Sequence, residues 1–416
     1  MKRTFHIVAM IVFAAFACIN LQSCKQAEKV EDLIVVDLSQ EYPVLELELT
    51  DIADISYIPL KGKDSVQFLS TPSSFANNIH IDDEHIFIGD FSPYTKDGKW
   101  HRFNPKNGKL LLFDSKGNYL NTVFNSKNEN ETIMFGMKTP FAVVPEKGEI
   151  YAFSAYSKLI RKFNYKGDII SDSQKFEKEY GEFALLGDTI VLFDIDAQLI
   201  LMNGNYKDKG ATLKLYSTGT GEIIPHKGLP FAKPLNGSGS IADTKMTITG
   251  SGIYITTQRS DTVYHIDRNL GITPRFLSVR HYEEAHNLLY PLVETEDYIL
   301  FCNGQDYLSY RNRIFKNANW RYLKREKQIY RLPCSNHFPE DNEEILWKNE
   351  FLLSCTHTTR NSNTLAAVMS VQMLKEKYNL LPPQLKSITD AAAEDDNPVL
   401  MVMRFGKKSL AKYGIN

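Results

Sequence analysis

Short apolar segments separated by polar turns recur through most of the chain. Leu110 to Phe113 is followed by the polar turn Asp-Ser-Lys-Gly-Asn and then by a second apolar segment at Tyr119 and Leu120. Comparable units begin at Leu159, Leu213 and Val263. Each unit has a turn glycine, and these glycines stand at positions 117, 167, 221 and 271, with spacings of 50, 54 and 50 residues. Glycine suits such hairpin turns because it adopts a positive φ without steric strain.

Further apolar segments lie between these units. They cover 149–153, 189–194, 252–256 and 297–301. The segment Thr189–Asp194 is almost continuously apolar, which is typical of a strand that is buried on both faces. Repeating units of about 50 residues with four short antiparallel strands predict an all-β fold, a β-propeller.

The number of blades follows from the length of the repeating region. It runs from 33 to 405 and contains an insertion at 92–106 and an expected short C-terminal helical excursion at about 363–393. Without these two segments, the remaining length corresponds to about six units of the propeller-blade size. We therefore expect six blades, with seven as the alternative.

Two segments near the ends of the propeller carry more specific predictions. Apolar residues at near-helical spacing predict a helix over 365–378 that packs on the last blade, and the alternative is a partner-binding helix. Pro382 and Pro383 prevent this helix from continuing. We also expect Ile55–Leu60 and Val399–Phe405 to pair, because propellers usually close one blade with strands from both termini.

The N-terminus has the pattern of a bacterial lipoprotein signal. Lys2 and Arg3 precede an uncharged run from Ile7 to Ile19, which is of signal-peptide length. Leu21-Gln22-Ser23-Cys24 then resembles a lipobox, which implies that Cys24 is lipidated and that the lipid holds the protein on the membrane. Cys18 is the competing cysteine, and a secreted protein with a free Cys24 is a further alternative. The predicted organisation is a signal peptide at 1–23, a tether at 24–32, a propeller at 33–405 and a tail at 406–416.

Charge and cysteine content exclude some classes of protein. The formal net charge is -2, and it becomes -4 once residues 1–23 are removed. A nucleic-acid-binding protein would carry a basic excess, so we expect no nucleic-acid partner. Cys302, Cys334 and Cys355 can form at most one disulfide among themselves.

Three signatures resemble those of a known family. They are Asp51–Leu60, Ser260–Tyr264 with Pro274–Phe276, and Glu394–Leu400. Together they are similar to the opening, central and closing signatures of the six-bladed β-propeller lipoproteins of Gram-negative bacteria, which are distantly similar to NHL-repeat propellers. The resemblance implies an outer-membrane lipoprotein in the cell envelope, and it implies no particular activity.

Motifs for metal, cofactor or covalent chemistry are scarce. His281 and His286 are five residues apart, so on a helix they would not share a face as zinc ligands do. The acidic cluster 394–396 lacks the alternating spacing and central glycine of a calcium loop. We therefore predict no metal site, no cofactor and no catalytic residue.

The insertion at 92–106 is the first of two candidate binding segments. Tyr94, Trp100, His101 and Arg102 would form an aromatic platform for a sugar ring, flanked by hydrogen-bond donors. The alternative is that Trp100 covers the core of a blade. We expect a glycan ligand if the platform is exposed.

The basic segment 311–331 is the second candidate. It carries eight Lys and Arg residues and a single Glu. Arg321, Lys324 and Arg325 would bind an anionic partner, and the alternative is an ordinary solvated surface. In both cases we expect these side chains to be exposed and to contribute little to stability.

The sequence leaves three functions open. We favour a non-catalytic binding or assembly lipoprotein, for a glycan or an envelope protein. The alternatives are a metal-assisted hydrolase or lyase with its site in the central funnel, and a purely structural envelope component. Convergence of His, Asp, Glu and Asn side chains at the axis would distinguish them.

Overall fold

The structure is a computed structural model of the whole chain. It describes residues 33–37, 40–45, 49–62, 79–90, 109–125, 141–154, 157–177, 180–194, 213–225, 244–257, 261–279, 287–305, 319–332, 359–393 and 396–406. Cys18, Cys24, the insertion at 92–106, the pair His281 and His286, and all but the first residue of the expected tail lie outside these ranges. The predictions made for them therefore stay predictions.

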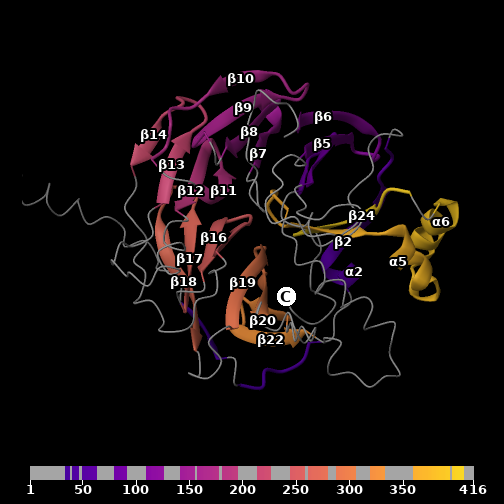
Figure 1. Cartoon of the computed structure of the whole chain (residues 1–416). Coiled ribbons are helices and arrows are strands. Elements are labelled where there is room, and N and C mark those ends of the chain that lie inside the picture. Colours follow the sequence, from indigo (N-terminus) through magenta and orange to yellow (C-terminus); the bar gives the residue numbers. More distant parts are fainter. Residues whose placement is uncertain are drawn as a thin grey trace, which may run out of the picture.

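Within the described residues, the strands form six small sheets arranged in a ring, which confirms a six-bladed β-propeller (Figure 1). Blade 1 contains β3 (Ile79–Ile81), β4 (His85–Asp90), β5 (Lys109–Asp114) and β6 (Tyr119–Asn125). Blade 2 contains β7 (Phe141–Val144), β8 (Glu149–Ser154), β9 (Leu159–Asn164) and β10 (Ile169–Asp172). Blade 3 contains β11 (Tyr180–Leu186), β12 (Thr189–Asp194), β13 (Leu213–Ser217) and β14 (Ile223–Pro225).

The second half of the chain continues the ring. Blade 4 contains β15 (Thr244–Ile248), β16 (Gly252–Thr257), β17 (Thr262–Asp267) and β18 (Ile272–Val279). Blade 5 contains β19 (Asn287–Glu294), β20 (Tyr298–Gln305), β21 (Asn319–Leu323) and β22 (Gln328–Leu332). Blade 6 contains β23 (Thr364–Met369), β24 (Val399–Phe405) and β2 (Ala53–Pro59). Because β7, β11, β15 and β19 contact one another in turn, these first strands lie nearest the axis.

The core lies between neighbouring blades, and β12 shows how the sequence produces it. Val191 and Phe193 pack in the apolar cluster shared with blade 4, whereas Ile190 and Leu192 pack in the cluster shared with blade 2. Successive side chains of a strand point to opposite faces, so a strand between two packed sheets is apolar at every position. This explains the continuous apolar run seen in the sequence.

The N-terminal segment forms backbone hydrogen bonds to four blades. Its strand β1 (Ile34–Asp37) pairs in parallel with β18 of blade 4. The backbone N–H of Leu45 then donates to the carbonyl of Arg331 in blade 5. Next, β2 pairs with β24 from Ala53 to Pro59, as predicted for closure of the ring. Finally, the backbone N–H of Lys61 donates to the carbonyl of Gly117 in blade 1 at 2.7 Å.

The predicted helix over 365–378 is partly wrong. Thr364–Met369 forms strand β23, and the helix α5 covers only Val371–Glu376. Leu365 and Met369 pack in one apolar cluster while Ala366 and Val368 pack in another, so this strand is apolar on both faces and mimics helical spacing.

A second helix begins at the second proline of the pair. Pro383 begins α6 (Pro383–Ala391), because a proline suits the first turn of a helix. Leu374 and Leu385 pack with Met401 of blade 6, so the expected packing on the last blade is confirmed. None of the helices within the described ranges is long and apolar enough to cross a membrane.

The turn glycines meet their expected role in three of four units. Gly117, Gly167 and Gly221 have φ values of 83°, 92° and 74°. In the fourth unit, Leu270 takes the positive φ of 65° instead of Gly271. A Cβ on Gly271 would lie 2.8 Å from Asp267 Oδ2, so any other residue there would displace this carboxylate.

Candidate functional site

Hairpins from several blades converge at one end of the propeller axis. They join the first and second strands of blades 1 to 4, and segment 359–363, which precedes β23 of blade 6, reaches the same end. The cavity between them has a volume of about 470 Å³. Its lining includes His80, Asp82, Phe141, Leu185, Leu186, Ile248, Arg268, Arg360, Asn361 and Ser362. This size is within the range of small-molecule sites.

Arg360 forms a rigid part of the cavity. Its backbone N–H donates to the carbonyl of Ile79 in blade 1 at 2.6 Å. Its Nη1 donates to the carbonyl of Phe183 in blade 3 at 2.8 Å, and its guanidinium lies 5.7 Å from the ring of Phe141 in blade 2. The backbone of Arg360 is therefore bonded to blade 1, and its side chain contacts blades 2 and 3.

Asn361 and Asn363 hold the same segment in place. The side-chain amide of Asn361 donates to the carbonyl of Ile81 and accepts from its N–H, both at 2.6 Å. Asn363 Oδ1 accepts from the backbone N–H of Glu294 at 3.0 Å and from that of Gly250 at 3.4 Å. Segment 359–363 is thereby bonded to blades 1, 3, 4 and 5, which gives the cavity a preformed floor.

His80 lies in the wall of blade 1. It is buried, and neither ring nitrogen has a hydrogen-bond partner. Burial lowers the pKa of His80 to about 4, with Asp82 acting in the opposite direction and Arg360 in the same direction. The ring is therefore neutral at pH 7 and carries one donor and one acceptor.

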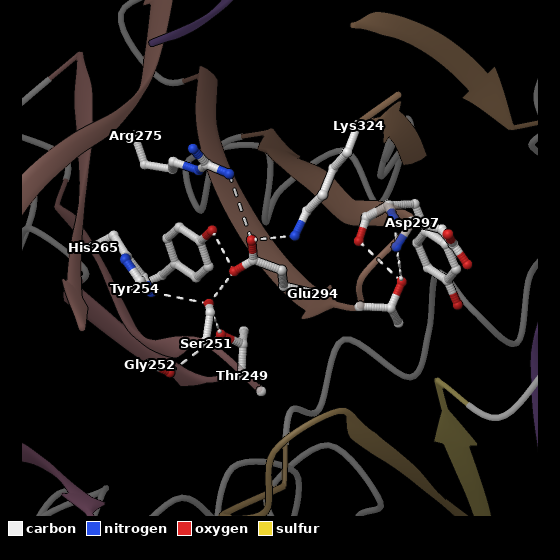
Figure 2. Close-up of polar contacts among 12 residues, drawn as sticks. Thr249, Ser251, Gly252, Tyr254, His265, Arg275, Glu294, Asp297 and Lys324 are labelled. Carbon is white, nitrogen blue, oxygen red and sulfur yellow. Dashed lines mark hydrogen bonds and ion pairs between the residues drawn. The ribbon is translucent and has the colours of Figure 1, made fainter. Parts of the chain in front are cut away.

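A buried polar network lies between blades 4 and 5, beside the cavity (Figure 2). Glu294, at the end of β19, accepts hydrogen bonds from the hydroxyls of Ser251 and Tyr254, the latter at 2.8 Å. Lys324 Nζ lies 2.8 Å and Arg275 Nη2 3.6 Å from Glu294 Oε1. The Glu294 carboxylate thus contacts β16, β18 and the turn before β16 in blade 4, and the turn after β21 in blade 5.

His265 extends this network. Its Nε2 lies 3.0 Å from the Ser251 hydroxyl, which also lies 3.1 Å from the hydroxyl of Thr249 in the cavity lining. Burial alone would raise the pKa of Glu294, but Lys324 and the hydrogen bonds from Ser251 and Tyr254 hold it below its usual value. Burial and the nearby Glu294 raise the pKa of Tyr254 well above its ordinary value. The network therefore contains a neutral Tyr254 and an ionised Glu294, and the Glu294 carboxylate lies between the two cations Lys324 and Arg275.

In the described part of the basic segment, 319–331, Arg321, Lys324 and Arg325 do not form the exposed patch that we expected. Arg321 is 0 % exposed, and its guanidinium lies 3.7 Å from the centre of the Tyr298 ring with no hydrogen-bond partner. Lys324 is directed to Glu294, and only Arg325 of the three is exposed. The error arises because Arg321 lies in β21, whose residues 320–323 are all buried, whereas Lys324 and Arg325 follow the strand. Tyr94, Trp100, His101 and Arg102 lie outside the described residues.

Polar side chains of several blades, among them His80, Asp82 and Asn361, line the cavity at the axis. Within the described part of the chain, no group of three or more His, Cys, Asp and Glu side chains could hold a metal ion. Sequence reasoning missed Arg360 and Glu294. A signal for Glu294 was present, because it precedes the predicted strand 297–301. It therefore falls near a hairpin between the first two strands of a blade, and hairpins of this kind line the cavity in blades 1 to 4.

Comparisons with known proteins support the fold. No family profile matches the chain, and no curated protein sequence matches it. A structure described as an exported protein of Bacteroides fragilis is 13% identical, covers 90% of this chain and 100% of its own, and superimposes with a TM-score of 0.55. A member of the DUF4221 family from Bacteroides vulgatus is 8% identical, covers 86% and 99% of the two chains, and has a TM-score of 0.45.

Virginiamycin B lyase from Staphylococcus aureus is more distant. It is 11% identical, covers 68% of this chain and 75% of its own, and has a TM-score of 0.38. At 13% identity the likeness to the Bacteroides fragilis protein concerns the fold alone, and nothing further follows from the other two structures. The resemblance to the propeller lipoprotein family is carried by the sequence signatures, not by these comparisons.

Proposed function

We propose that the protein is an exported lipoprotein, anchored on the cell envelope through Cys24, whose propeller is a non-catalytic binding scaffold. The observation that supports binding is the cavity at the axis, whose lining comes from five blades. Leu185, Leu186 and Ile248 end buried strands but are themselves partly exposed there. Apolar walls with a few fixed polar groups are typical of ligand sites.

The site is preformed, which favours binding. Segment 359–363 already has backbone or side-chain bonds to four blades, so a ligand would not have to order it. Preorganisation of this kind leaves more of the interaction free energy for affinity. An additional glycan or envelope partner at Tyr94, Trp100, His101 and Arg102 stays part of the proposal on sequence grounds.

Ligand binding is tested by thermal-shift screening of full-length protein in detergent against a library of sugars, organic acids, amino acids and short peptides. We expect at least one compound to raise the melting temperature, and Ile248→Trp, which fills the cavity, to abolish that rise. Ile224→Trp is the matched control, because Ile224 is exposed on the outer strand of blade 3. A library without hits, or hits that survive Ile248→Trp, would contradict a ligand site in this cavity.

Anchoring is tested separately by fractionation of cells. Cys24→Ala should move the protein out of the membrane fraction, because the acyl chains have lost their attachment residue, whereas Cys18→Ala should leave it there. The opposite pair of results would assign the lipid to Cys18.

A further inference from the structure

Charges of opposite sign lie on opposite walls of the central cavity. Asp82 belongs to the hairpin between β3 and β4 in blade 1, and Arg268 belongs to the turn between β17 and β18 in blade 4. The blades follow one another round the ring in chain order, so blades 1 and 4 face each other across the axis (Figure 1). The cavity therefore has an acidic side and a basic side.

On the acidic side, one oxygen of the Asp82 carboxylate accepts hydrogen bonds and the other does not. Asp82 Oδ1 accepts from the N–H groups of Glu84 and His85, whereas Oδ2 is buried without any partner. The side chain of Asp82 is 15% exposed, and its neighbours Asp83 and Glu84 are exposed. Because the partly exposed Asp82 side chain lines the cavity, its negative charge favours a cationic group of a ligand at this wall.

The basic side offers donors to an anion. Arg268 is exposed and donates Nη2 to the carbonyl of Gly250 at 3.1 Å. A guanidinium has five N–H donors arranged to meet both oxygens of a carboxylate. Arg360 also lines the cavity and adds a second positive charge. Between the two sides, Leu185, Leu186 and Ile248 offer an apolar surface.

We infer that the cavity binds a short peptide with free termini. Its ammonium group lies at Asp82, its carboxylate at Arg268, and an apolar side chain packs on Leu186 and Ile248. This inference rests on the proposed function, because it assumes that the cavity is the ligand site. A neutral sugar would leave both walls without a counter-charge, and a simple organic anion would pair with Arg268 but leave Asp82 without one.

A volume of about 470 Å³ favours two or three residues over a single amino acid. A free amino acid presents the same two charged groups, so the experiment has to separate these two sources. Leucine, Leu-Leu and Leu-Leu-Leu are therefore titrated side by side. The inference predicts that Leu-Leu or Leu-Leu-Leu binds at least ten times more tightly than leucine.

The test is isothermal titration of full-length protein in detergent with Leu-Leu, N-acetyl-Leu-Leu, Leu-Leu-amide and galacturonate. We expect each blocked terminus to weaken binding at least tenfold, and galacturonate to bind more weakly than Leu-Leu. Arg268→Gln should weaken Leu-Leu binding tenfold but leave the affinity for Leu-Leu-amide unchanged. Asp82→Asn, which keeps an acceptor for the hairpin, should likewise leave the affinity for N-acetyl-Leu-Leu unchanged.

Arg325→Gln is the control, because Arg325 is exposed and lies outside the cavity lining. Melting temperatures of all variants establish that they are folded. Equal affinity for free and blocked peptides, tighter binding of galacturonate or of leucine, or no peptide binding at all would overturn the inference. If another library compound still binds and is lost in Ile248→Trp, the proposed function stands without it.

Discussion

Arg321 combines full burial, a positive charge and the absence of a hydrogen-bond partner in one side chain. Burial lowers the pKa of Arg321 to about 10, so that the guanidinium stays charged at neutral pH. Its compensation is the Tyr298 ring at 3.7 Å, and a desolvated cation and aromatic ring of this kind contribute about 2 kcal/mol. The desolvation cost is of a similar size or larger.

This balance predicts different results for two substitutions of Arg321. Arg321→Met keeps the packing and removes the buried charge, so the free energy of unfolding should change by less than about 1.5 kcal/mol. Arg321→Ala leaves a cavity and should cost about 2 to 5 kcal/mol. Urea denaturation measures both, with Arg325→Met as the exposed control. A large loss in Arg321→Met would show that the charge itself is essential to the fold.

His80 predicts a pH dependence of stability. Its folded pKa of about 4 lies below the ordinary value of 6.5, so between these values the unfolded chain takes up a proton that the folded chain does not. Stability should therefore fall as the pH decreases from about 6.5, and this loss should level off near pH 4, at up to about 3 kcal/mol.

The contribution of His80 is isolated by a difference measurement. His80→Leu removes the titrating group and leaves the other acids and bases in place. The difference in unfolding free energy between wild type and His80→Leu should decrease by up to about 3 kcal/mol from pH 7 to pH 4. A difference that is constant over this range would mean that the pKa of His80 is the same in the folded and the unfolded protein.

At the scale of elements, the strand pattern was predictable because blades repeat. The segments expected at 149–153, 189–194, 252–256 and 297–301 correspond to β8, β12, β16 and β20. Strand β23 was not predictable, since Leu365, Val368 and Met369 are apolar on both faces and fit a helix equally well. The charged groups that join the blades were also missed, because Glu294 and Arg275 are adjacent only after the sheets have packed.

The network at Glu294 connects the first strand of blade 5 to three strands of blade 4. Glu294→Gln keeps the shape of the side chain but leaves Arg275 and Lys324 without their counter-charge. Removing one member of a buried ion pair costs about 3 to 5 kcal/mol, and we expect a loss of this size in urea denaturation. Glu296→Gln, two residues away and exposed, should change stability by less than about 0.5 kcal/mol. Equal effects of the two substitutions would contradict a structural role for the network.

At the scale of the whole molecule, the N-terminal segment contacts the outer edges of blades 4, 5, 6 and 1. The pairing of β2 with β24 was predictable, because ring closure by both termini removes exposed edges. The parallel pairing of β1 was not, since Ile34–Asp37 is short and its partner β18 is distant in sequence. By adding a fifth strand to blade 4, β1 covers an edge that would otherwise be open.

Strand β1 therefore predicts an alternating effect of substitutions. Val36 is 0% exposed and packs with Phe276 and Trp320, whereas Val35 is 51% exposed. Val36→Ala should lower the free energy of unfolding by about 1 to 3 kcal/mol, because it removes buried apolar surface, and Val35→Ala should change it by less than about 0.5 kcal/mol. Urea denaturation of full-length protein in detergent compares the two variants. If Val36→Ala and Val35→Ala lower the free energy of unfolding equally little, β1 does not stabilise blade 4.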